Sequence, residues 1–208
     1  KEGKAVVKVK DGKKVVATAE AAIDENVVIP VPDAKLWSPD SPFLYDLYIT
    51  LVENGETLDE VKGYFGMRKI SLGKDGSHTR MFLNNEPLFH IGPLDQGFWP
   101  DGIYTAPTDE ALLYDIQITK QMGFNMIRKH IKIEPRRWYY HCDRLGLAVW
   151  QDFVNGGGEY NPWHVAFLPF LGFKHKDSDY KYFAREQEEG REEYKRELTE
   201  MITSLYNC

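Results

Sequence analysis

The sequence predicts two domains of different classes, a β-sandwich over residues 1–73 followed by a parallel α/β domain over residues 79–208. In the first part, short apolar runs are separated by turn signals about every 8–12 residues, which is typical of a sandwich. In the second part, strand and helix patterns alternate three times, which predicts parallel strands joined by right-handed crossovers. The stretch Gly73-Lys74-Asp75-Gly76 marks the boundary at which the apolar period changes.

Strands of the first part are expected where apolar and polar residues alternate between turn residues. Asp11-Gly12 and Asn54-Gly55 join consecutive runs, and such dipeptides are strong hairpin signals. The Pro-rich connection 32–42 is expected to lie outside the ladders, because proline has no N–H to donate. The expected strands are residues 5–10, 14–19, 26–31, 43–53, 57–62 and 64–72.

The second part is expected to open with a hairpin made of residues 81–83, the turn Asn84-Asn85 and residues 88–91, and this hairpin is expected to lead into a buried strand. Helix 109–122 should begin after the N-cap Thr108 and end at Gly123. The remaining elements are strand 125–128, helix 135–145 with Gly146 as its stop, strand 147–152, and a helix over about 186–205. This alternation fits a barrel and an open doubly wound sheet equally, and no G-x-G-x-x-G or Walker loop favours a nucleotide-binding fold.

The composition argues against several classes of protein. The net charge is −6, from 32 acidic and 26 basic residues, whereas a nucleic-acid binder needs a basic surface. No apolar run reaches about 18 residues, so no membrane span is expected. The two cysteines, Cys142 and Cys208, give neither a disulfide framework nor metal-ligand spacing, and Cys142 is expected to be a buried thiol. No cofactor, metal, nucleic acid or membrane is therefore expected as a partner.

Six sequence blocks in a fixed order resemble the glycoside hydrolases of family 2. Leu36-Trp37-Ser38-Pro39 and the later Leu44-Tyr45 resemble the signature of the family's sandwich domain, and residues 65–70 resemble its exit. Residues 82–88 are similar to the hairpin that enters the family's barrel, and residues 123–128 and 143–153 are similar to its second and third barrel strands. The resemblance implies an immunoglobulin-like sandwich, whose first strand could lie before Lys1, and about three β/α units of a TIM (β/α)₈ barrel.

The resemblance also implies a chemistry. Family members are retaining glycosidases, in which two glutamates about 5–5.5 Å apart act as acid/base and nucleophile. These glutamates follow barrel strands four and seven, so both are expected beyond Cys208, and the fragment of this exo-β-glycosidase is expected to be inactive. In Arg128-Lys129-His130 the histidine follows the arginine by two residues, where many β-galactosidases and β-glucuronidases have three. Trp150-Gln151-Asp152 is closer to the β-mannosidase-like branch, and no sugar is assigned.

Substrate-facing residues are expected at the C-terminal ends of the barrel strands, where barrel active sites form. By resemblance Arg128 would orient the nucleophilic glutamate, because a guanidinium forks onto a carboxylate, and His130 and Asp152 could bind sugar hydroxyls. The expected set is Asp95, Gln96, Arg128, His130, Trp150 and Asp152. A structural role is the alternative for each: an ion pair for Arg128, a structural histidine at position 130, and loop hydrogen bonds for Asp95 and Gln96.

The segment between Phe153 and Phe183 is long and aromatic, and a long loop on the active face of a barrel is usually functional. Trp163 is the leading candidate for stacking against a sugar ring. The alternative is that the aromatic side chains fill a small core of their own. The aromatic residues are Tyr160, Trp163, Phe167, Phe170, Phe173, Tyr180 and Tyr182.

Two hypotheses from different classes stay open. In the first, the longer protein is a glycosidase that acts on a carbohydrate substrate. In the second, the chain is a non-catalytic carbohydrate-binding or structural module. Three strands cannot close a barrel, so strand edges and apolar surface should be exposed, and self-association through the open barrel edge is expected.

Overall fold

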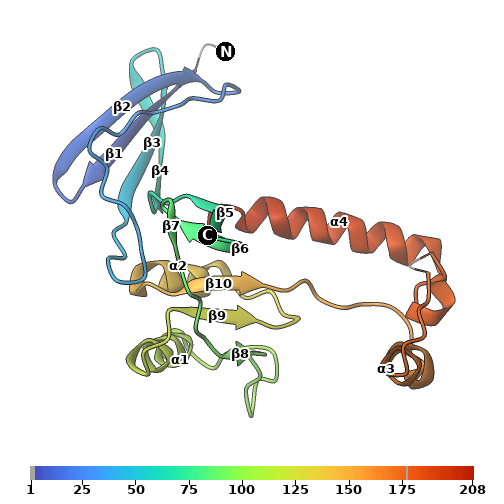
Figure 1. The fold of residues 1–208 in the computed structure, drawn as a ribbon. Coiled ribbons are helices and arrows are strands. Elements are labelled where there is room, and N and C mark those ends of the chain that lie inside the picture. The colour runs from blue at the N-terminus through green and yellow to red at the C-terminus, as the bar shows by residue number, and fades with distance from the viewer. Residues whose placement is uncertain (1–2, 177) are drawn as a thin grey trace. The chain divides into compact units, whose positions relative to one another are not determined.

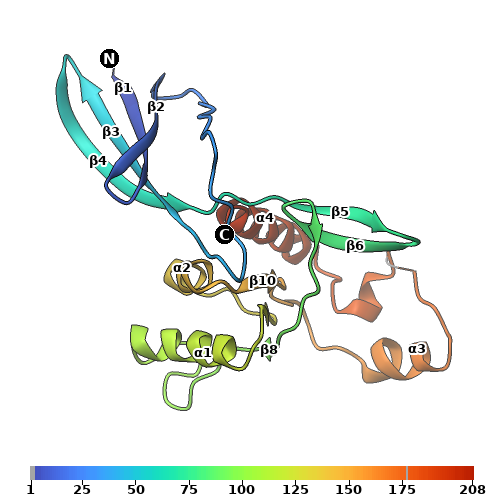
Figure 2. The same cartoon turned by 60° about the vertical axis from the view of Figure 1, so that its left-hand side comes forward.

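The computed structural model describes residues 3–176 and 178–208. These residues form two compact units, the first built from residues up to Arg128 together with Glu134–Trp150, and the second from Lys129–Ile133 together with Gln151–Cys208. Figures 1 and 2 show the elements of both units. Among the described residues, no helix combines the length and the apolar character that a membrane span requires.

The first unit begins with one four-stranded antiparallel sheet in the order β2-β1-β3-β4 (Figure 1). The expected hairpin turns are confirmed, since Asn54 and Gly55 both adopt positive φ, the conformation of a type I′ turn. Register places Ala19, Val7, Ile49 and Val61 in one row of the same face. The strands are β1 (Lys4–Asp11), β2 (Lys14–Ala22), β3 (Tyr45–Glu53) and β4 (Glu56–Phe65).

The strand expected at residues 26–31 is wrong, because this segment is irregular. Val28 is 90% exposed, so its apolar side chain finds no layer to pack against. Pro30 and Pro32 lack backbone N–H groups and cannot donate to a ladder. Residues 3–68 therefore supply one sheet, and the second layer of a sandwich is not among the described residues.

A second sheet follows in the order β5-β6-β7, and the β5–β6 hairpin is seen most fully in Figure 2. The expected turn at Asn84-Asn85 is confirmed, with φ of 52° and 69°. The domain boundary predicted at residues 73–76 lies within the β5–β6 hairpin, and the division into domains at this point stays a prediction. The strands are β5 (Ile70–Asp75), β6 (His78–Leu83) and β7 (Glu86–Pro87).

The second arm of the hairpin, expected at residues 88–91, is also wrong, because these residues are irregular and the arm is β7. The strand expected after the hairpin is present but is not buried. The strand is β8 (Leu94–Asp95), and Phe89 and Ile91 before it are 72% and 48% exposed. Pro93 interrupts the segment because it lacks an N–H. The carbonyl groups of Ile91 and Pro93 still accept hydrogen bonds from residues 125–128, so only part of the segment joins the ladder.

The elements predicted after β8 are each confirmed. Helix α1 (Asp109–Gln121) is capped by the Thr108 hydroxyl, which accepts from Ala111 N at 3.2 Å. Strand β9 (Met126–Lys129), helix α2 (Arg136–Leu145) and strand β10 (Ala148–Gln151) follow, and α2 ends at Gly146 in the left-handed conformation. The core here includes Leu112, Ile116, Ile127, Trp138, Leu147 and, as expected, the Cys142 thiol.

Hydrogen bonds connect the segment before β3 to helix α2 within the first unit. Trp37 is 1% exposed, and its indole N–H donates to the Asp143 carbonyl oxygen at 2.7 Å. Arg68 Nη1 lies 2.6 Å from Asp143 Oδ1, and Tyr64 donates to Asp143 Oδ2 at 3.1 Å. A side chain on Gly146 would place its Cβ 2.3 Å from the Pro39 carbonyl oxygen, so this close approach requires glycine.

The second unit consists of a long loop with short helical turns and one long helix. The short turns are η1 (Trp163–Phe167), α3 (Leu168–Phe170) and η2 (Tyr180–Phe183). Helix α4 (Glu188–Leu205) confirms the last helix of the sequence prediction. Its surface carries charge pairs one turn apart, including Lys195 with Glu192 and Arg196 with Glu200.

Candidate substrate-facing site

Backbone hydrogen bonds show which side chains of the sheet β10-β9-β8 share a face. Arg128 N donates to the Pro93 carbonyl oxygen at 3.0 Å, and Ala148 N donates to the Asn125 carbonyl oxygen at 2.9 Å. In a parallel ladder these bonds put Arg128 beside both Leu94 and Trp150. Neighbouring residues along a strand face opposite sides, so Ile127, which is 2% exposed, lies on the other face.

Arg128 and Trp150 therefore come from adjacent strands and lie on one open face. Leu94 is 52% exposed and Trp150 is 40% exposed, and Arg128 between them is also exposed. A guanidinium on an open face stays charged and can fork onto a carboxylate or donate to hydroxyl groups. This arrangement brings two of the predicted site residues together.

His90 fixes the indole of Trp150. The Trp150 Nε1–H donates to His90 Nδ1 at 2.7 Å, and the two rings meet edge to face with centroids 5.6 Å apart. Nδ1 can accept this bond only when it carries no proton, so the proton of the neutral ring sits on Nε2. Burial lowers the pKa of His90 and thus favours the neutral ring that the bond requires.

His130 and Asp152 form a second pair, within the second unit. His130 Nε2 lies 3.9 Å from Asp152 Oδ2, and both side chains are about one quarter exposed (28% and 24%). Asp152 N donates to the Lys129 carbonyl oxygen at 3.0 Å, which extends the β9–β10 ladder to this pair. Gln151 Nε2 donates to the Lys132 carbonyl oxygen at 2.7 Å and so holds the chain beyond both strands. An imidazole and a carboxylate can donate to and accept from a polyhydroxylated ligand.

Asp95 and Gln96 lie at the end of β8. Asp95 Oδ1 accepts from Gly97 N at 2.7 Å, which closes a turn of the kind that the sequence left open as an alternative. Both residues line a hollow of about 500 Å³ together with Ile116 and Trp138 from the helices. Asp95 follows Leu94 directly in the strand, so its side chain lies on the face of the sheet opposite to that of Arg128.

Trp163 lies at the start of η1 and is 62% exposed. Its ring meets Phe167 edge to face, with centroids 4.6 Å apart. Phe170 is 86% exposed, and Pro162 and Ala166 complete a shallow apolar hollow around these rings. This part of the loop therefore does not bury its own aromatic rings, and their exposed faces are available for stacking.

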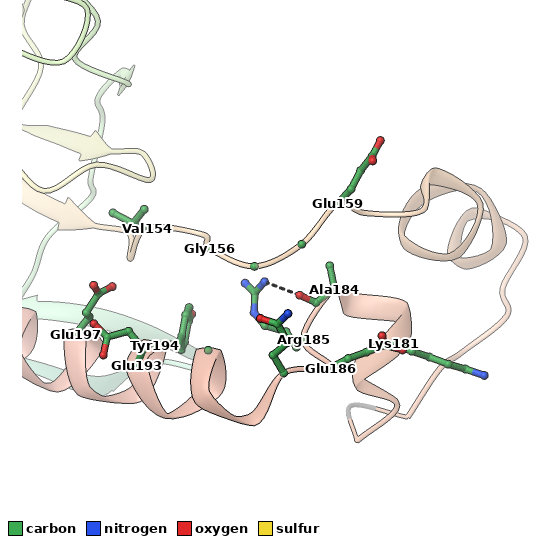
Figure 3. Close-up of a pocket in the computed structure, with 14 residues that line it drawn as sticks. Val154, Gly156, Glu159, Lys181, Ala184, Arg185, Glu186, Glu193, Tyr194 and Glu197 are labelled. Carbon is green, nitrogen blue, oxygen red and sulfur yellow. Dashed lines mark hydrogen bonds between the residues drawn. The ribbon is translucent and has the colours of Figure 1, made fainter.

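Sequence reasoning missed a cavity of about 650 Å³ in the second unit, shown in Figure 3. The Arg185 guanidinium donates to Asn155 Oδ1 at 2.6 Å and lies against Gly157, where a Cβ would come within 1.7 Å of Nη1. Tyr194, Glu193 and Glu197 of α4 line the cavity as well. A guanidinium and carboxylates around one cavity can bind a polar ligand. The run Gly156-Gly157-Gly158 was the available signal, since glycine permits such a close approach.

The comparisons with known proteins find similarity to glycosidases. The model of the glycosyl hydrolases of family 2 matches residues 1–68. A β-galactosidase of Lactococcus lactis is 32% identical over 122 residues, which is 58% of this chain and 12% of that protein. The chain spans only 11–14% of the length of the first curated relatives that it matches.

Solved structures extend the likeness beyond residue 68. An FMN-binding β-glucuronidase of Faecalibacterium prausnitzii L2-6 is 31% identical with a TM-score of 0.64, over 74% of this chain and 24% of that chain. A β-glycosidase of Bacteroides vulgatus is 25% identical with a TM-score of 0.67, over 76% of this chain and 20% of that chain.

Proposed function

We propose that the chain is a segment of a family 2 glycosyl hydrolase, and that the longer protein is a retaining exo-β-glycosidase that hydrolyses O-glycosidic bonds. Its relatives carry the names β-galactosidase and β-glucuronidase. The observation that carries the proposal is the open face on which Arg128 and Trp150 lie side by side at the ends of parallel strands. Substrates bind at this end of the strands in barrel enzymes.

We assign the finer fold on the same basis. The four-stranded sheet leaves Ile49 and Val61 of its apolar face 38% and 58% exposed, which is what an immunoglobulin-like sandwich lacking its second layer would show. The parallel sheet β10-β9-β8 fits the first three strands of a TIM barrel, whose interior would cover Leu94 and Trp150.

The predicted site residues receive roles within this proposal. Arg128 orients the nucleophilic glutamate, and His130 with Asp152 binds sugar hydroxyls. Trp163 stacks on a sugar ring, and Asp95 and Gln96 shape the loop after β8. Both catalytic glutamates belong to strands beyond these three, so residues 1–208 alone should not hydrolyse glycosides.

Hydrolysis of a panel of nitrophenyl β-glycosides tests the proposal, with the full-length protein beside residues 1–208. The full-length protein should cleave at least one substrate and the fragment none. Arg128→Ala in the full-length protein should lower kcat/KM by about 100-fold or more, since it removes a preorganised charge. Arg80→Ala is the matched control, because Arg80 pairs with Asp75 on an exposed hairpin.

A panel on which the full-length protein cleaves nothing would instead favour the non-catalytic carbohydrate-binding module. The exposed rings of Trp163, Phe167 and Phe170 are the observation that favours this second candidate. Binding of sugars without turnover, lost in Trp163→Ala, would establish it.

We also propose that residues 1–208 self-associate through the edges of β8 and β10. Both are edge strands of the parallel sheet, and exposed apolar side chains flank them, including Phe89 and Leu94. Such edges and patches promote association. Light scattering should report species larger than a monomer at micromolar concentration, and a clean monomer would contradict this part of the proposal.

A further inference from the structure

Two histidines outside the candidate site meet within the second unit. His164 lies in η1, and His175 lies in the loop before η2. His164 Nδ1 and His175 Nε2 are 3.5 Å apart, and the two ring centroids are 5.2 Å apart at an interplanar angle of 64°. Neither side chain takes part in the arrangement around Arg128 or Asp152.

These distances fit a shared metal ion better than a direct hydrogen bond. A good N–H···N bond would bring the nitrogens to about 3 Å. Two nitrogens that aimed directly at one another from 3.5 Å would also hold the ring centres farther apart than 5.2 Å. Two imidazoles that each lie about 2.0–2.1 Å from one tetrahedral zinc ion place their nitrogens about 3.4 Å apart and their ring centres about 5.3 Å apart.

Aromatic neighbours hold both rings in place. The Tyr182 ring lies 4.3 Å from the His164 ring and 4.5 Å from the His175 ring, tilted by 35° and 33°. Phe183 meets His175 edge to face at 6.5 Å. Both histidines are half-buried, so solvent can still deliver an ion. Side chains fixed by packing lose little freedom when a ligand binds, which favours binding.

We propose that His164 Nδ1 and His175 Nε2 bind one divalent first-row transition metal ion, with zinc as the reference ion. Imidazole suits zinc, nickel and copper, whereas magnesium and calcium require oxygen ligands. Among the described residues, no group of three or more His, Cys, Asp or Glu side chains could hold a metal. Water or a ligand group would fill the remaining positions, so the site is open and binding is weaker than at a full structural zinc site.

A bound ion would act on the loop that carries Trp163. His164 directly follows Trp163, and His175 is separated from it by η1 and α3. An ion shared by the two histidines would cross-link these segments and fix the backbone beside the exposed Trp163 ring. Sequence reasoning could not find this site, because the histidines are eleven positions apart, which is not a ligand spacing, and only the fold of the loop brings them together.

Calorimetric titration of tag-free residues 1–208 with zinc chloride at neutral pH tests the proposal. One zinc ion should bind per chain, and His164→Ala or His175→Ala should each weaken binding by about tenfold or more. His78→Ala is the control, since His78 is exposed on the β5–β6 hairpin, and should leave binding unchanged. Magnesium chloride should give no heat of binding. No binding by the unchanged chain, or binding by both alanine variants as tight as that of the unchanged chain, would overturn the site.

A second measurement avoids the risk that an alanine disturbs the loop. Paramagnetic nickel added to the unchanged chain should broaden the ring resonances of His164, His175 and Tyr182 before those of His78. Acid pH should reverse the effect, because protons compete for the ring nitrogens. Uniform broadening, or broadening that begins at His78, would overturn the proposal. The test does not depend on glycosidase activity.

Discussion

Trp37 and Trp163 show how differently one residue type is used in the two units. Trp37 is 1% exposed, and its indole N–H is bonded to a carbonyl oxygen of α2. Trp163 is 62% exposed and contacts Phe167. A buried tryptophan stabilises a fold through area and one satisfied donor, whereas an exposed ring costs the fold little to keep and leaves a face free for a ligand. Trp37 therefore belongs to the scaffold of the first unit, whereas the loop around Trp163 is a second place, besides the open face of Arg128 and Trp150, where binding should be sought.

The largest expected effect separates the two tryptophans directly. Trp37→Ala should lower the free energy of unfolding by about 3–5 kcal/mol, because it removes a large buried ring and leaves a cavity. Trp163→Ala should change the same quantity by no more than about 0.5 kcal/mol. Urea unfolding followed by far-UV circular dichroism measures both. Equal losses in the two variants would break the comparison.

The buried ion pair beneath Trp37 gives the next largest effect. Arg68→Met should lower the free energy of unfolding by about 3 kcal/mol, since it leaves the Asp143 carboxylate buried without its cation. Burial already raises the pKa of Asp143, and Arg68 opposes that rise. The loss should therefore shrink as pH falls, because protonation of Asp143 removes the buried charge.

An exposed ion pair is the control for Arg68→Met. Lys4 and Glu20 are 2.6 Å apart, but their side chains are 51% and 56% exposed. Glu20→Gln should change the free energy of unfolding by less than about 1 kcal/mol at every pH at which Arg68→Met is measured. A loss in Arg68→Met that did not vary with pH would show that Asp143 is not the group left uncompensated.

A smaller effect tests the cap of α1. Thr108→Ala should lower the free energy of unfolding by about 1 kcal/mol, because the Ala111 N–H loses its acceptor. Thr108→Ser keeps a hydroxyl and should stay close to the unchanged chain. Thermal unfolding of the three proteins side by side measures the difference, and a loss of the same size in Thr108→Ser would show that the methyl group matters more than the cap.

Local signals account for what the sequence could predict. The cap at Thr108, the stop at Gly146 and the turns at Asn54-Gly55 and Asn84-Asn85 depend on residues close together in the chain, and each is found. The strands expected at residues 26–31 and 88–91 are absent. The apolar content of these two segments predicted that they would be buried in strands. Burial also requires a second layer of structure to pack against, and a local sequence pattern cannot reveal whether that layer is present.

The candidate site was predictable in part for the same reason. The ends of parallel strands meet at one edge, so Arg128 and Trp150 could be placed together before the structure was known. The hydrogen-bond partner of Trp150 could not be predicted, because His90 is 60 residues away and lies in a segment expected to be the arm of a hairpin. The His164 and His175 pair depends on the path of an irregular loop, for which no periodic pattern exists.

The smallest expected effect concerns the link between His90 and Trp150. Burial lowers the pKa of His90 below its ordinary value of 6.5, so between these two values the unfolded chain binds a proton that the folded chain does not. The stabilising link is present above the ordinary value and is lost as pH falls through the lowered one. The Trp150 indole N–H resonance should shift upfield across this range, and in His90→Phe it should lie upfield at every pH. An indole resonance that changed with neither the pH nor the substitution would show that Trp150 is held by packing alone. In that case burial, and not hydrogen bonding, would distinguish the tryptophans of the first unit from Trp163 in the loop.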